Sequence, residues 1–279
     1  MRYRSVLVTG ASTGIGRATA LLLDANGWTV FAGVRKEVDG ASLAFEASDR
    51  LVPLILDVTK PAEIAKAAKA ITKAVDERGL NGLVNNAGTA HAAPLEFVPL
   101  QSFRDQLEVN LVGQLAVTQA MLPLLRAARG RIVNVTSIGG LIAGTMLGPY
   151  NASKFALEAL THVLRQELEP WGIEAIAIEP GQIATPIWAT SSSRSDELIT
   201  PQAAAMYDDK IAGARRMAAN AATNGLPAIE VAKVIEKALT AKKPKTRYPV
   251  GADAKLGATL IARLPDRARD RIFAGRRTK

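Results

Sequence analysis

Short runs of apolar residues alternate with longer segments whose apolar positions recur at helical spacing along most of the chain. The apolar runs predict six strands, at residues 6–8, 28–34, 51–56, 82–85, 131–136 and 173–178. The helical spacing predicts helices between them, at about residues 15–25, 61–79, 102–128 and 150–169. Continuous apolar strands that alternate with helices are typical of a parallel sheet covered on both faces. The sequence therefore predicts an α/β fold, a doubly wound parallel sheet of the Rossmann-like type.

The chain shows no internal repeat and no interdomain linker, so we expect a single domain over residues 1–279. Residues 189–200, with three consecutive serines, form the most loop-like stretch. We expect this stretch to belong to an insertion, a mobile substrate lid at about residues 186–225. A basic C-terminal extension is expected at about residues 251–279.

Composition limits the chemistry that is open to the chain. Its 279 residues include 35 Lys and Arg against 26 Asp and Glu, for a net charge of +9, and no cysteine. Without cysteine there is no disulfide, no thiolate nucleophile and no Cys-ligated metal. The basic excess lies in residues 242–279, with 12 basic and 3 acidic residues, whereas residues 1–241 hold 23 of each sign. Because the body of the chain is charge-balanced, we expect no nucleic-acid partner.

No targeting segment is visible before the first apolar run, and no run of 18 or more apolar residues occurs. We therefore expect a cytoplasmic location. The extension offers peripheral membrane contact through an amphipathic helix, with apolar Leu256, Leu260, Ile261 and Leu264 and cationic Arg263, Arg267 and Arg271. The alternative is a tail that is solvated or packed on a partner subunit.

A glycine-rich turn joins the first strand to the first helix, with the sequence Thr9-Gly10-Ala11-Ser12-Thr13-Gly14-Ile15-Gly16. Glycines permit a tight turn and let the backbone approach a pyrophosphate, which sits at the N-terminus of the following helix. Because this turn stands between a strand and a helix, it predicts a dinucleotide-binding site.

Further motifs follow the later strands, at the sheet edge where doubly wound folds bind ligands. They are Asn85-Asn86-Ala87-Gly88, Ser137, and Pro180-Gly181 with Thr185 close behind. Asn110 lies in the helix after the fourth strand, and Tyr150 and Lys154 open the helix after the fifth. In this order, T-G-x-x-x-G-x-G, N-N-A-G and Y-x-x-x-K resemble the short-chain dehydrogenase/reductase family over residues 5 to about 250. The resemblance implies an enzyme that acts on CH–OH groups with a nicotinamide cofactor.

The resemblance also implies which residues hold that cofactor. They are Gly10, Ser12, Thr13, Gly14, Ile15, Gly16, Arg35, Asp57, Val58, Asn86, Ala87, Gly88, Tyr150, Lys154, Pro180, Gly181, Ile183 and Thr185. Asp57 and Val58 match the pair that contacts the adenine in the family.

Tyr150 and Lys154 are four residues apart, so both side chains share one face of a helix. A free tyrosine has a pKa of about 10, and a nearby ammonium lowers it toward neutral pH. The resemblance implies that Tyr150 is the general acid in carbonyl reduction and the base in alcohol oxidation. Lys154 then also holds the nicotinamide ribose, and Ser137 orients the substrate oxygen. Asn110 anchors a water that links Lys154 to solvent.

The end of the second strand bears on the choice of cofactor. An acidic residue there binds the free 2′-hydroxyl of NAD, while an arginine accommodates the 2′-phosphate of NADP. The chain has Val34 at the position of the acid, followed by Arg35. We therefore expect NADP(H) to be preferred, with NAD(H) as the alternative if Arg35 merely faces solvent.

Apolar residues around the catalytic motifs indicate a lipophilic alcohol or ketone as substrate. They are Leu141, Ile142, Ala143, Met146, Leu147, Ile183, Pro186, Ile187 and Trp188. Residues 30–35 and 246–251 are similar to hydroxysteroid and retinol dehydrogenases, which implies a steroid- or retinoid-like substrate. The alternative is that these apolar residues are only core.

Two further readings stay open from the residues alone. One is a NAD-dependent dehydrogenase of the same family, and the other is a non-catalytic nucleotide-binding scaffold, against which the intact Ser137, Tyr150 and Lys154 argue. His91 is expected in a solvated loop and His162 at the surface or an interface; neither has a partner at metal-ligand spacing, so we expect no metal. By the same resemblance, the helices around Leu111 and after Tyr150 imply a homodimer or homotetramer.

Overall fold

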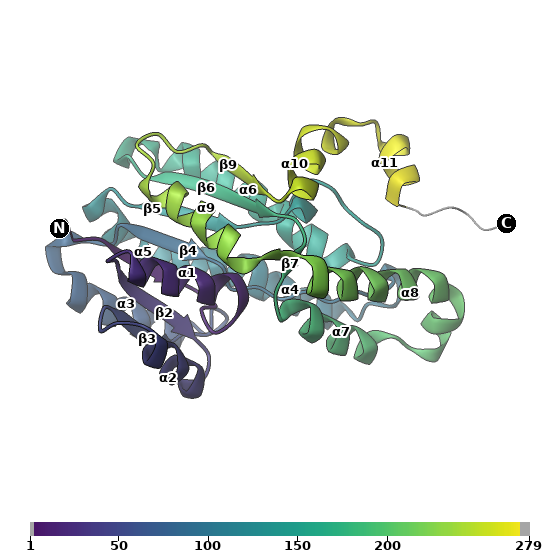
Figure 1. Ribbon diagram of the computed structural model, residues 1–279, viewed down its shortest axis with the longest axis horizontal. Helices are drawn as coiled ribbons and strands as arrows, with labels where there is room; N and C mark the ends of the chain where they lie inside the picture. The colour runs from purple at the N-terminus through teal and green to yellow at the C-terminus, as the bar shows by residue number, and fades with distance from the viewer. Residues whose placement is uncertain (1–2, 274–279) are drawn as a thin grey trace.

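A seven-stranded parallel sheet forms the centre of the protein (Figure 1). The computed structural model describes residues 3–273. The strands are β1 (Ser5–Val8), β2 (Thr29–Val34), β3 (Leu51–Ile55), β4 (Gly82–Asn85), β5 (Arg131–Val135), β6 (Glu174–Pro180) and β9 (Arg247–Val250). Their order in the sheet is β3-β2-β1-β4-β5-β6-β9, and the chain reverses direction across the sheet between β3 and β4. The predicted doubly wound, Rossmann-like fold is confirmed.

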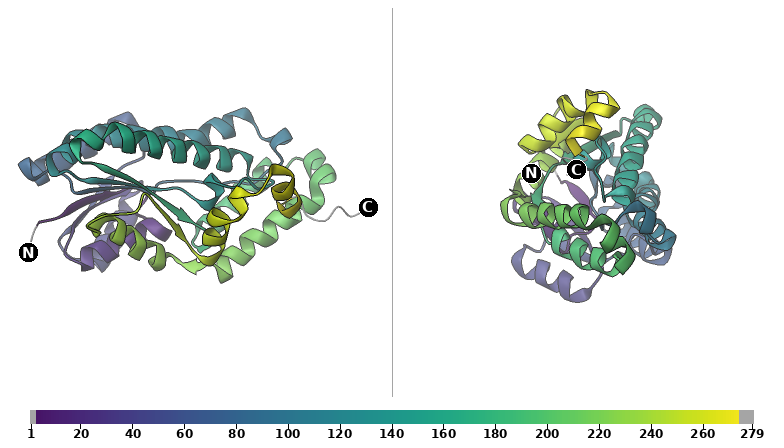
Figure 2. Two further views of the ribbon diagram at one scale, coloured as in Figure 1. Left: turned by 90° about the horizontal axis from the view of Figure 1, so that it is seen from above. Right: turned by 90° about the vertical axis from the view of Figure 1, so that its right-hand side faces the viewer.

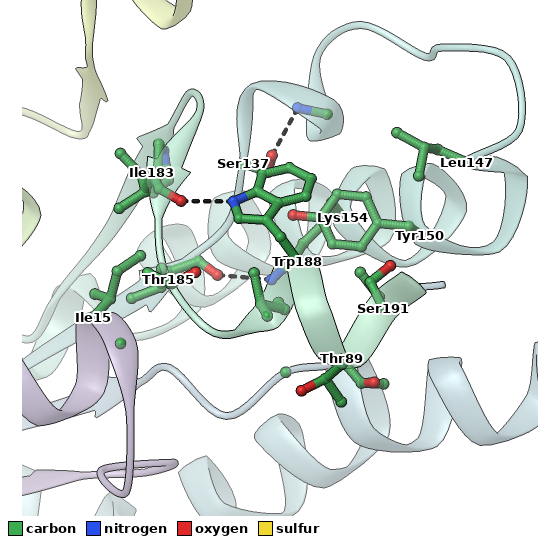
Figure 3. Close-up of a pocket in the computed structure, with 18 of the residues that line it drawn as sticks. Ile15, Thr89, Ser137, Leu147, Tyr150, Lys154, Ile183, Thr185, Trp188 and Ser191 are labelled. Atoms are coloured by element: carbon green, nitrogen blue, oxygen red, sulfur yellow. Dashed lines mark hydrogen bonds between the residues drawn. The ribbon is translucent and has the colours of Figure 1, made fainter. Parts of the chain in front are cut away.

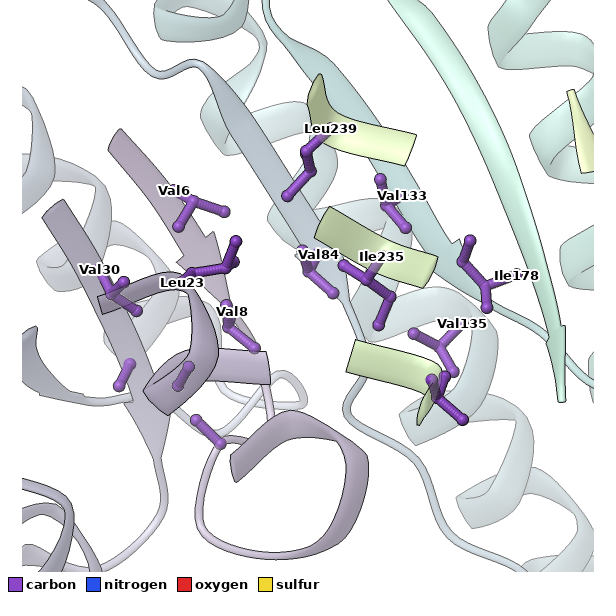
Figure 4. Close-up of a cluster of buried hydrophobic side chains, with 14 of the residues drawn as sticks. Val6, Val8, Leu23, Val30, Val84, Val133, Val135, Ile178, Ile235 and Leu239 are labelled. Carbon is purple, nitrogen blue, oxygen red and sulfur yellow. The ribbon is translucent and has the colours of Figure 1, made fainter. Parts of the chain in front are cut away.

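Helices cover both faces of this sheet (Figure 2). The helices packed on it are α1 (Gly14–Ala25), α2 (Glu37–Glu46), α3 (Pro61–Val75), α5 (Gly113–Ala128), α6 (Gly148–Glu167) and α9 (Ala228–Thr240), while α4 (Leu100–Leu107) packs on α6. Alternate residues of each strand point to opposite faces, so Val6 and Val8 join one buried cluster and Leu7 the other. On the first face, Leu23 of α1 and Ile235 of α9 pack over the strands (Figure 4). Burial on both faces explains why the strands are continuous apolar runs.

The six predicted strands are confirmed, and a seventh, β9, was not predicted. This strand is short, carries Pro249 and lies at the sheet edge beside β6. Proline cannot donate a hydrogen bond to a neighbouring strand, so it is tolerated mainly in edge strands. A short segment that contains proline therefore lacks the sequence pattern by which a strand is predicted.

Residues 100–128 form one continuous helical run, in which a π turn, η3 (Glu108–Val112), separates α4 from α5. By length and mean hydropathy this run is apolar enough to cross a membrane. Val117, Met121 and Leu125 of α5 are fully buried in the cluster against the sheet. The run is apolar because one of its faces is buried against the sheet.

Two helices, α7 (Ile187–Leu198) and α8 (Pro201–Asn224), extend beyond the carboxyl ends of the strands (Figure 1). The short strands β7 (Ile183–Ala184) and β8 (Leu226–Pro227) pair at their base. The prediction of a loop at residues 189–200 is wrong, because most of these residues belong to the helix α7. Serine hydroxyls on α7 donate to carbonyls one turn back, as Ser195 Oγ does to Ser191 O at 2.7 Å, so the serine run is compatible with a helix. The two helices occupy the predicted lid, whose mobility stays a prediction.

The C-terminal segment forms three short helices rather than one. They are α10 (Ala252–Thr259), the 3₁₀ turn η6 (Ile261–Arg263) and α11 (Asp266–Phe273). The prediction of one amphipathic helix is therefore wrong within the described residues, since Pro265 has no N–H to continue it. Ala254 and Gly257 are buried, so α10 is part of the folded body. Residues 274–279 of the predicted extension lie outside the described residues, and membrane contact stays a prediction.

Short 3₁₀ turns complete the path of the chain. They are η1 (Asp76–Arg78), η2 (Leu95–Phe97), η4 (Ile138–Gly140) and η5 (Glu169–Trp171).

Candidate active site

One large cavity, of about 1200 Å³, opens at the carboxyl ends of the strands. Its wall includes every predicted cofactor residue except Gly16 and every predicted catalytic residue except Asn110. In Figure 3, Tyr150 and Lys154 from α6 lie on one side of this space, and Trp188 and Ser191 from α7 lie near them. The sheet therefore brings residues from distant parts of the chain to one site, as its topology requires.

The turn before α1 has the geometry of an anion site. Thr13 precedes the helix without a side-chain capping bond, and the first turn of α1 carries no acidic side chain. The first N–H groups of the helix are therefore open to a bound phosphate. Gly10 has a φ of +64°, and a Cβ there would lie 2.8 Å from the Ala87 Cα, so only glycine fits. This arrangement fits the pyrophosphate of a dinucleotide.

Gly16 has a packing role instead of lining the cavity. A Cβ at Gly16 would lie 2.3 Å from both Asn86 Nδ2 and Gly10 O, so the glycine lets α1 approach the turns after β1 and β4. Asn86 Nδ2 donates to Thr9 O at 2.9 Å and to Gly10 O at 3.0 Å, and Thr9 Oγ1 accepts from Ala87 N at 3.0 Å. These bonds hold the two turns together, so the Asn86 amide group fixes the shape of the cofactor site.

The end of the cavity at β2 and β3 carries Arg35 and Asp57. Arg35 is exposed, and it makes no hydrogen bond or ion pair with another residue in the range 3–273. Asp57 Oδ1 accepts from Thr59 N at 3.0 Å and from Thr59 Oγ1 at 2.8 Å. Burial raises the pKa of Asp57, but these bonds and the charges of Lys60 and Arg35 outweigh it and hold the pKa below its usual value. An ionised acceptor and a free guanidinium thus stand at the same end of the cavity.

Tyr150, Lys154 and Ser137 meet at the opposite end. The Lys154 Nζ lies 5.8 Å from the centre of the Tyr150 ring and donates to Val135 O at 2.9 Å. Ser137 Oγ accepts from Gly139 N at 2.9 Å, which orients the hydroxyl beside Tyr150 and makes its O–H the donor toward a neighbouring oxygen. A Cβ at Gly88 would lie 3.9 Å from the Lys154 Nζ, so this glycine leaves space above the ammonium.

Burial shifts the pKa values of Tyr150 and Lys154 in opposite directions. Burial raises the pKa of Tyr150, and hydrogen bonding to Ser137 opposes this. The net direction is upward and Lys154 does not contribute to it, so the predicted lowering of the Tyr150 pKa toward neutral pH is wrong. Burial lowers the pKa of Lys154 to about 8, and the charge of Glu158 opposes this. Strongly shifted pKa values in a cleft mark a candidate catalytic site.

Asn110 lies in the π turn η3 and its side chain is fully engaged. Its Nδ2 donates to Thr89 O at 2.9 Å and to Ser153 Oγ at 3.0 Å, and its Oδ1 accepts from Thr89 N at 2.8 Å. Ser153 Oγ donates in turn to Tyr150 O at 2.7 Å. Asn110 therefore ties the turn after β4 to the start of α6. The predicted water anchor stays a prediction.

A buried ion group lies one turn further along α6. Glu158 pairs with Arg247 Nη1 at 2.9 Å, and Arg247 also bonds Glu179 of β6 and contacts His162. Burial raises the pKa of Glu158, and the charges of Arg247 and Lys154 are among the effects that oppose this. Because Arg247 belongs to β9, the strand missing from the sequence prediction, this group was not foreseen.

The apolar wall near Ser137, Tyr150 and Lys154 is larger than predicted. Seven of the nine predicted residues line the cavity, all but Leu141 and Ala143. The C-terminal Leu256, Gly257 and Ile261 also line it, and sequence reasoning missed them. The α8 residues in the wall belong to the predicted lid. Only the apolar character of residues 256–261 could have indicated that they line the cavity. The prediction of a membrane contact rests on this same apolar character instead.

Of the two histidines, His91 lies in a different environment from the one predicted. His91 is buried, and burial followed by the charge of Arg194 lowers its pKa, so the predicted solvated loop is wrong. The loop is covered by α7, where Ser195 Oγ accepts from Ala92 N at 2.7 Å. His162 is half-buried beside Arg247. Among residues 3–273, no three His, Asp or Glu side chains gather in a way that could hold a metal.

Comparison with known proteins agrees with this site. The family model described as short chain dehydrogenase matches residues 4–196. The chain is 36% identical to the NADPH-dependent 3-dehydrocapnine reductase of Ornithobacterium rhinotracheale, over 98% of this chain and 96% of that protein. It is 38% identical to retinol dehydrogenase 5 of Mus musculus (96% and 87% covered) and 37% identical to 17-beta-hydroxysteroid dehydrogenase type 6 of Bos taurus (98% and 88%).

A solved structure gives the same result for the fold. A short chain dehydrogenase from Burkholderia cenocepacia J2315, in complex with NADP, superposes with a TM-score of 0.72 at 27% identity. The match covers 96% of this chain and 95% of that one.

Proposed function

The chain belongs to the short-chain dehydrogenase family, and from that premise we propose that it interconverts a lipophilic secondary alcohol and its ketone with NADP(H). The family is one of NAD(P)-dependent oxidoreductases that act on CH–OH groups. The observation that carries the finer proposal is the meeting of Ser137, Tyr150 and Lys154 in the cavity that also contains the α1 turn and Arg35.

The proposed chemistry divides between the cofactor and the protein. When bound, the nicotinamide cofactor supplies or accepts the hydride. Ser137 donates its O–H to the substrate oxygen and orients the carbonyl. Tyr150 gives a proton to that oxygen during reduction and removes it during oxidation. The Lys154 ammonium, near the Tyr150 ring, stabilises the phenolate that this transfer leaves behind.

The preference for NADP(H) is supported by Arg35. Its exposed guanidinium lies beside the ionised Asp57 at the adenosine end of the cavity, and it is free to fork onto a 2′-phosphate. No carboxylate stands at the buried Val34, where NAD-preferring relatives hold the ribose. The NADPH-dependent relative and the NADP-bound structure agree with this choice.

The lipophilic substrate is supported by the apolar wall around the reacting position and by relatives named for retinol and a hydroxysteroid. Ile142, Met146 and Leu147 precede α6, and Trp188 lies on α7. The Trp188 Nε1 donates to Ile183 O at 2.6 Å, which fixes the indole ring in the wall.

Loss of NADPH absorbance with a panel of lipophilic carbonyl compounds, including a steroid ketone and the aldehyde retinal, tests this function. We expect turnover by the native protein, little turnover by Tyr150→Phe, and a higher kcat/KM with NADPH than with NADH. Tight NADPH binding without turnover of any carbonyl would contradict the proposal and favour a nucleotide-binding scaffold. A higher kcat/KM with NADH would favour the NAD-dependent alternative.

We also propose a homodimer or homotetramer in the cytoplasm. Exposed apolar side chains on the two predicted interface helices support the assembly, namely Val112 before α5 and Phe155 and Val163 on α6. Sedimentation of the native protein and of Phe155→Glu tests it, since the charge should shift the mass toward that of a monomer. A native protein that sediments as a monomer would contradict it.

A further inference from the structure

Three cations line the substrate side of the cavity and have no part in the chemistry proposed above. Arg194 lies on α7, and Lys210 and Arg216 lie on α8. All three belong to the two helices of the predicted lid. Arg35, in contrast, follows β2 and is assigned above to the adenosine end of the cavity.

Helical spacing directs the α8 cations toward the cavity. The α8 residues in its wall are Asp209, Lys210, Gly213, Ala214, Arg216 and Met217, which recur at the three- and four-residue spacing of one helix face. A Cβ at Gly213 would lie 3.9 Å from Arg216 Nη2. The guanidinium therefore lies over a residue without a side chain, on the face that borders the cavity.

Arg194 is anchored next to the catalytic residues. Its Nη1 donates to Thr89 Oγ1 at 2.6 Å. The backbone of Thr89 is held in turn by the Asn110 side chain, which also bonds Ser153 beside Lys154. The other guanidinium donors of Arg194 have no acceptor in the part of the chain that the structure describes. A guanidinium held by one nitrogen presents the rest of its fork to a carboxylate, phosphate or sulfonate.

Nearby acids do not balance these charges. None of Arg194, Lys210 and Arg216 forms an ion pair within residues 3–273. Of the acids that share this side of the wall, Asp253 accepts from Gln182 N at 2.7 Å, which leaves Asp209. The neighbouring Arg215 differs, because it pairs with Asp196 at 2.7 Å and lies outside this cavity.

We propose that the substrate is an anionic amphiphile, whose apolar body packs on the cavity wall and whose acidic group binds Arg194 with Arg216 and Lys210. The proposal rests on the oxidoreductase function proposed above and narrows its substrate class. Met146, Leu147 and Met217 supply apolar surface in the same wall. A neutral retinoid or steroid uses this surface but gives the three cations no anionic partner, although the Lys210 Nζ lies 5.4 Å from the centre of the Tyr207 ring.

The test compares long-chain oxo acids, with the ketone at successive positions, with their methyl esters as substrates of the full chain with NADPH. A hydrogen-bonded charge pair predicts that kcat/KM for the best acid exceeds that for its ester by about 10- to 100-fold. The acid-to-ester ratio should fall toward one in Arg194→Gln and Arg216→Gln. It should be preserved in Arg215→Gln, the matched control.

Equal kcat/KM for acids and esters would overturn the proposal, as would an equal loss of the ratio in the Arg215→Gln control. If no ketone is turned over, the oxidoreductase function itself has failed. Calorimetric binding of an acid and its ester to the NADPH-loaded protein still decides this proposal: tighter binding of the acid, lost in Arg194→Gln, supports it, and equal affinities overturn it.

Discussion

Replacing Lys154 should stabilise the protein while it removes the turnover proposed above. Lys154 is 5% exposed, and its ammonium has one hydrogen bond from Nζ, to Val135 O at 2.9 Å. Burial lowers its pKa from the ordinary 10.5 to about 8, even though Glu158 opposes this. Lys154→Met keeps the length of the side chain and removes the buried charge.

The size of the effect follows from the change in pKa. At about 1.4 kcal/mol per pKa unit, a fall from 10.5 to about 8 corresponds to roughly 3 kcal/mol of destabilisation at neutral pH. The lost hydrogen bond to Val135 O costs about 1 kcal/mol. We therefore expect Lys154→Met to raise the free energy of unfolding by roughly 2 kcal/mol at pH 7.

The gain should depend on pH with a defined sign. Below pH 8 the lysine is protonated in both the folded and the unfolded chain, so the full cost of the buried charge is present. Between about pH 8 and 10.5 the folded protein releases the proton while the unfolded chain keeps it. Native stability contributed by this group therefore rises with pH across that window, and the advantage of the variant shrinks.

Urea unfolding followed by circular dichroism at pH 7 and pH 10 measures the gain, and kcat is measured in parallel. Lys66→Met, at an exposed position of α3, is the control and should leave stability within about 0.5 kcal/mol. A variant less stable than the native protein at pH 7, or a gain of equal size at both pH values, would refute the reasoning.

Four other changes test separate parts of the site. Tyr150→Phe should lower kcat by about 10²- to 10⁴-fold and leave the Kd for NADPH unchanged. Gly10→Ala should cost about 1–3 kcal/mol of stability, because its φ is positive and the new Cβ meets a backbone atom; urea unfolding measures it. Arg35→Gln should raise KM for NADPH by about 10- to 100-fold with little change for NADH. Glu158→Gln removes the charge that raises the pKa of Lys154, so the alkaline fall of kcat should begin at lower pH.

These four predictions fail on distinct results. Retention of most of the turnover by Tyr150→Phe would contradict the first prediction. An equal rise in KM for NADPH and NADH in Arg35→Gln would contradict the prediction for that residue. Gly144→Ala is the control for Gly10→Ala, since no atom lies within 4 Å of its new Cβ, and equal destabilisation by both would contradict the steric argument. A Glu158→Gln profile of unchanged shape and lower amplitude would indicate a structural role only.

The sheet and most of the site could be predicted because their signals are local. Val6, Leu7 and Val8 form a continuous apolar run because both faces of β1 are buried. Residues that follow each strand meet at one edge once the strands are parallel, which brings Ser137 and Tyr150 to the turn before α1. Neither inference needs contacts that are distant in sequence.

The misses depend on tertiary contacts. His91 is buried because α7 packs over its loop, and nothing near His91 in the sequence indicates this. The strand β9 exists through pairing with β6, since a short segment with Pro249 lacks a strand pattern. Leu256 and Ile261 line the cavity because the C-terminal helices return to it. From the sequence alone, their apolar character is equally compatible with contact to a membrane.

Deuterium transfer tests the central claim most directly. The native protein is given a lipophilic oxo acid and NADPH that carries deuterium at both C4 positions of the nicotinamide, and the alcohol formed is analysed by mass spectrometry. We predict one deuterium at the new carbinol carbon with the native protein, and almost no product with Tyr150→Phe. A product without deuterium, or equal rates for the two proteins, would contradict the account.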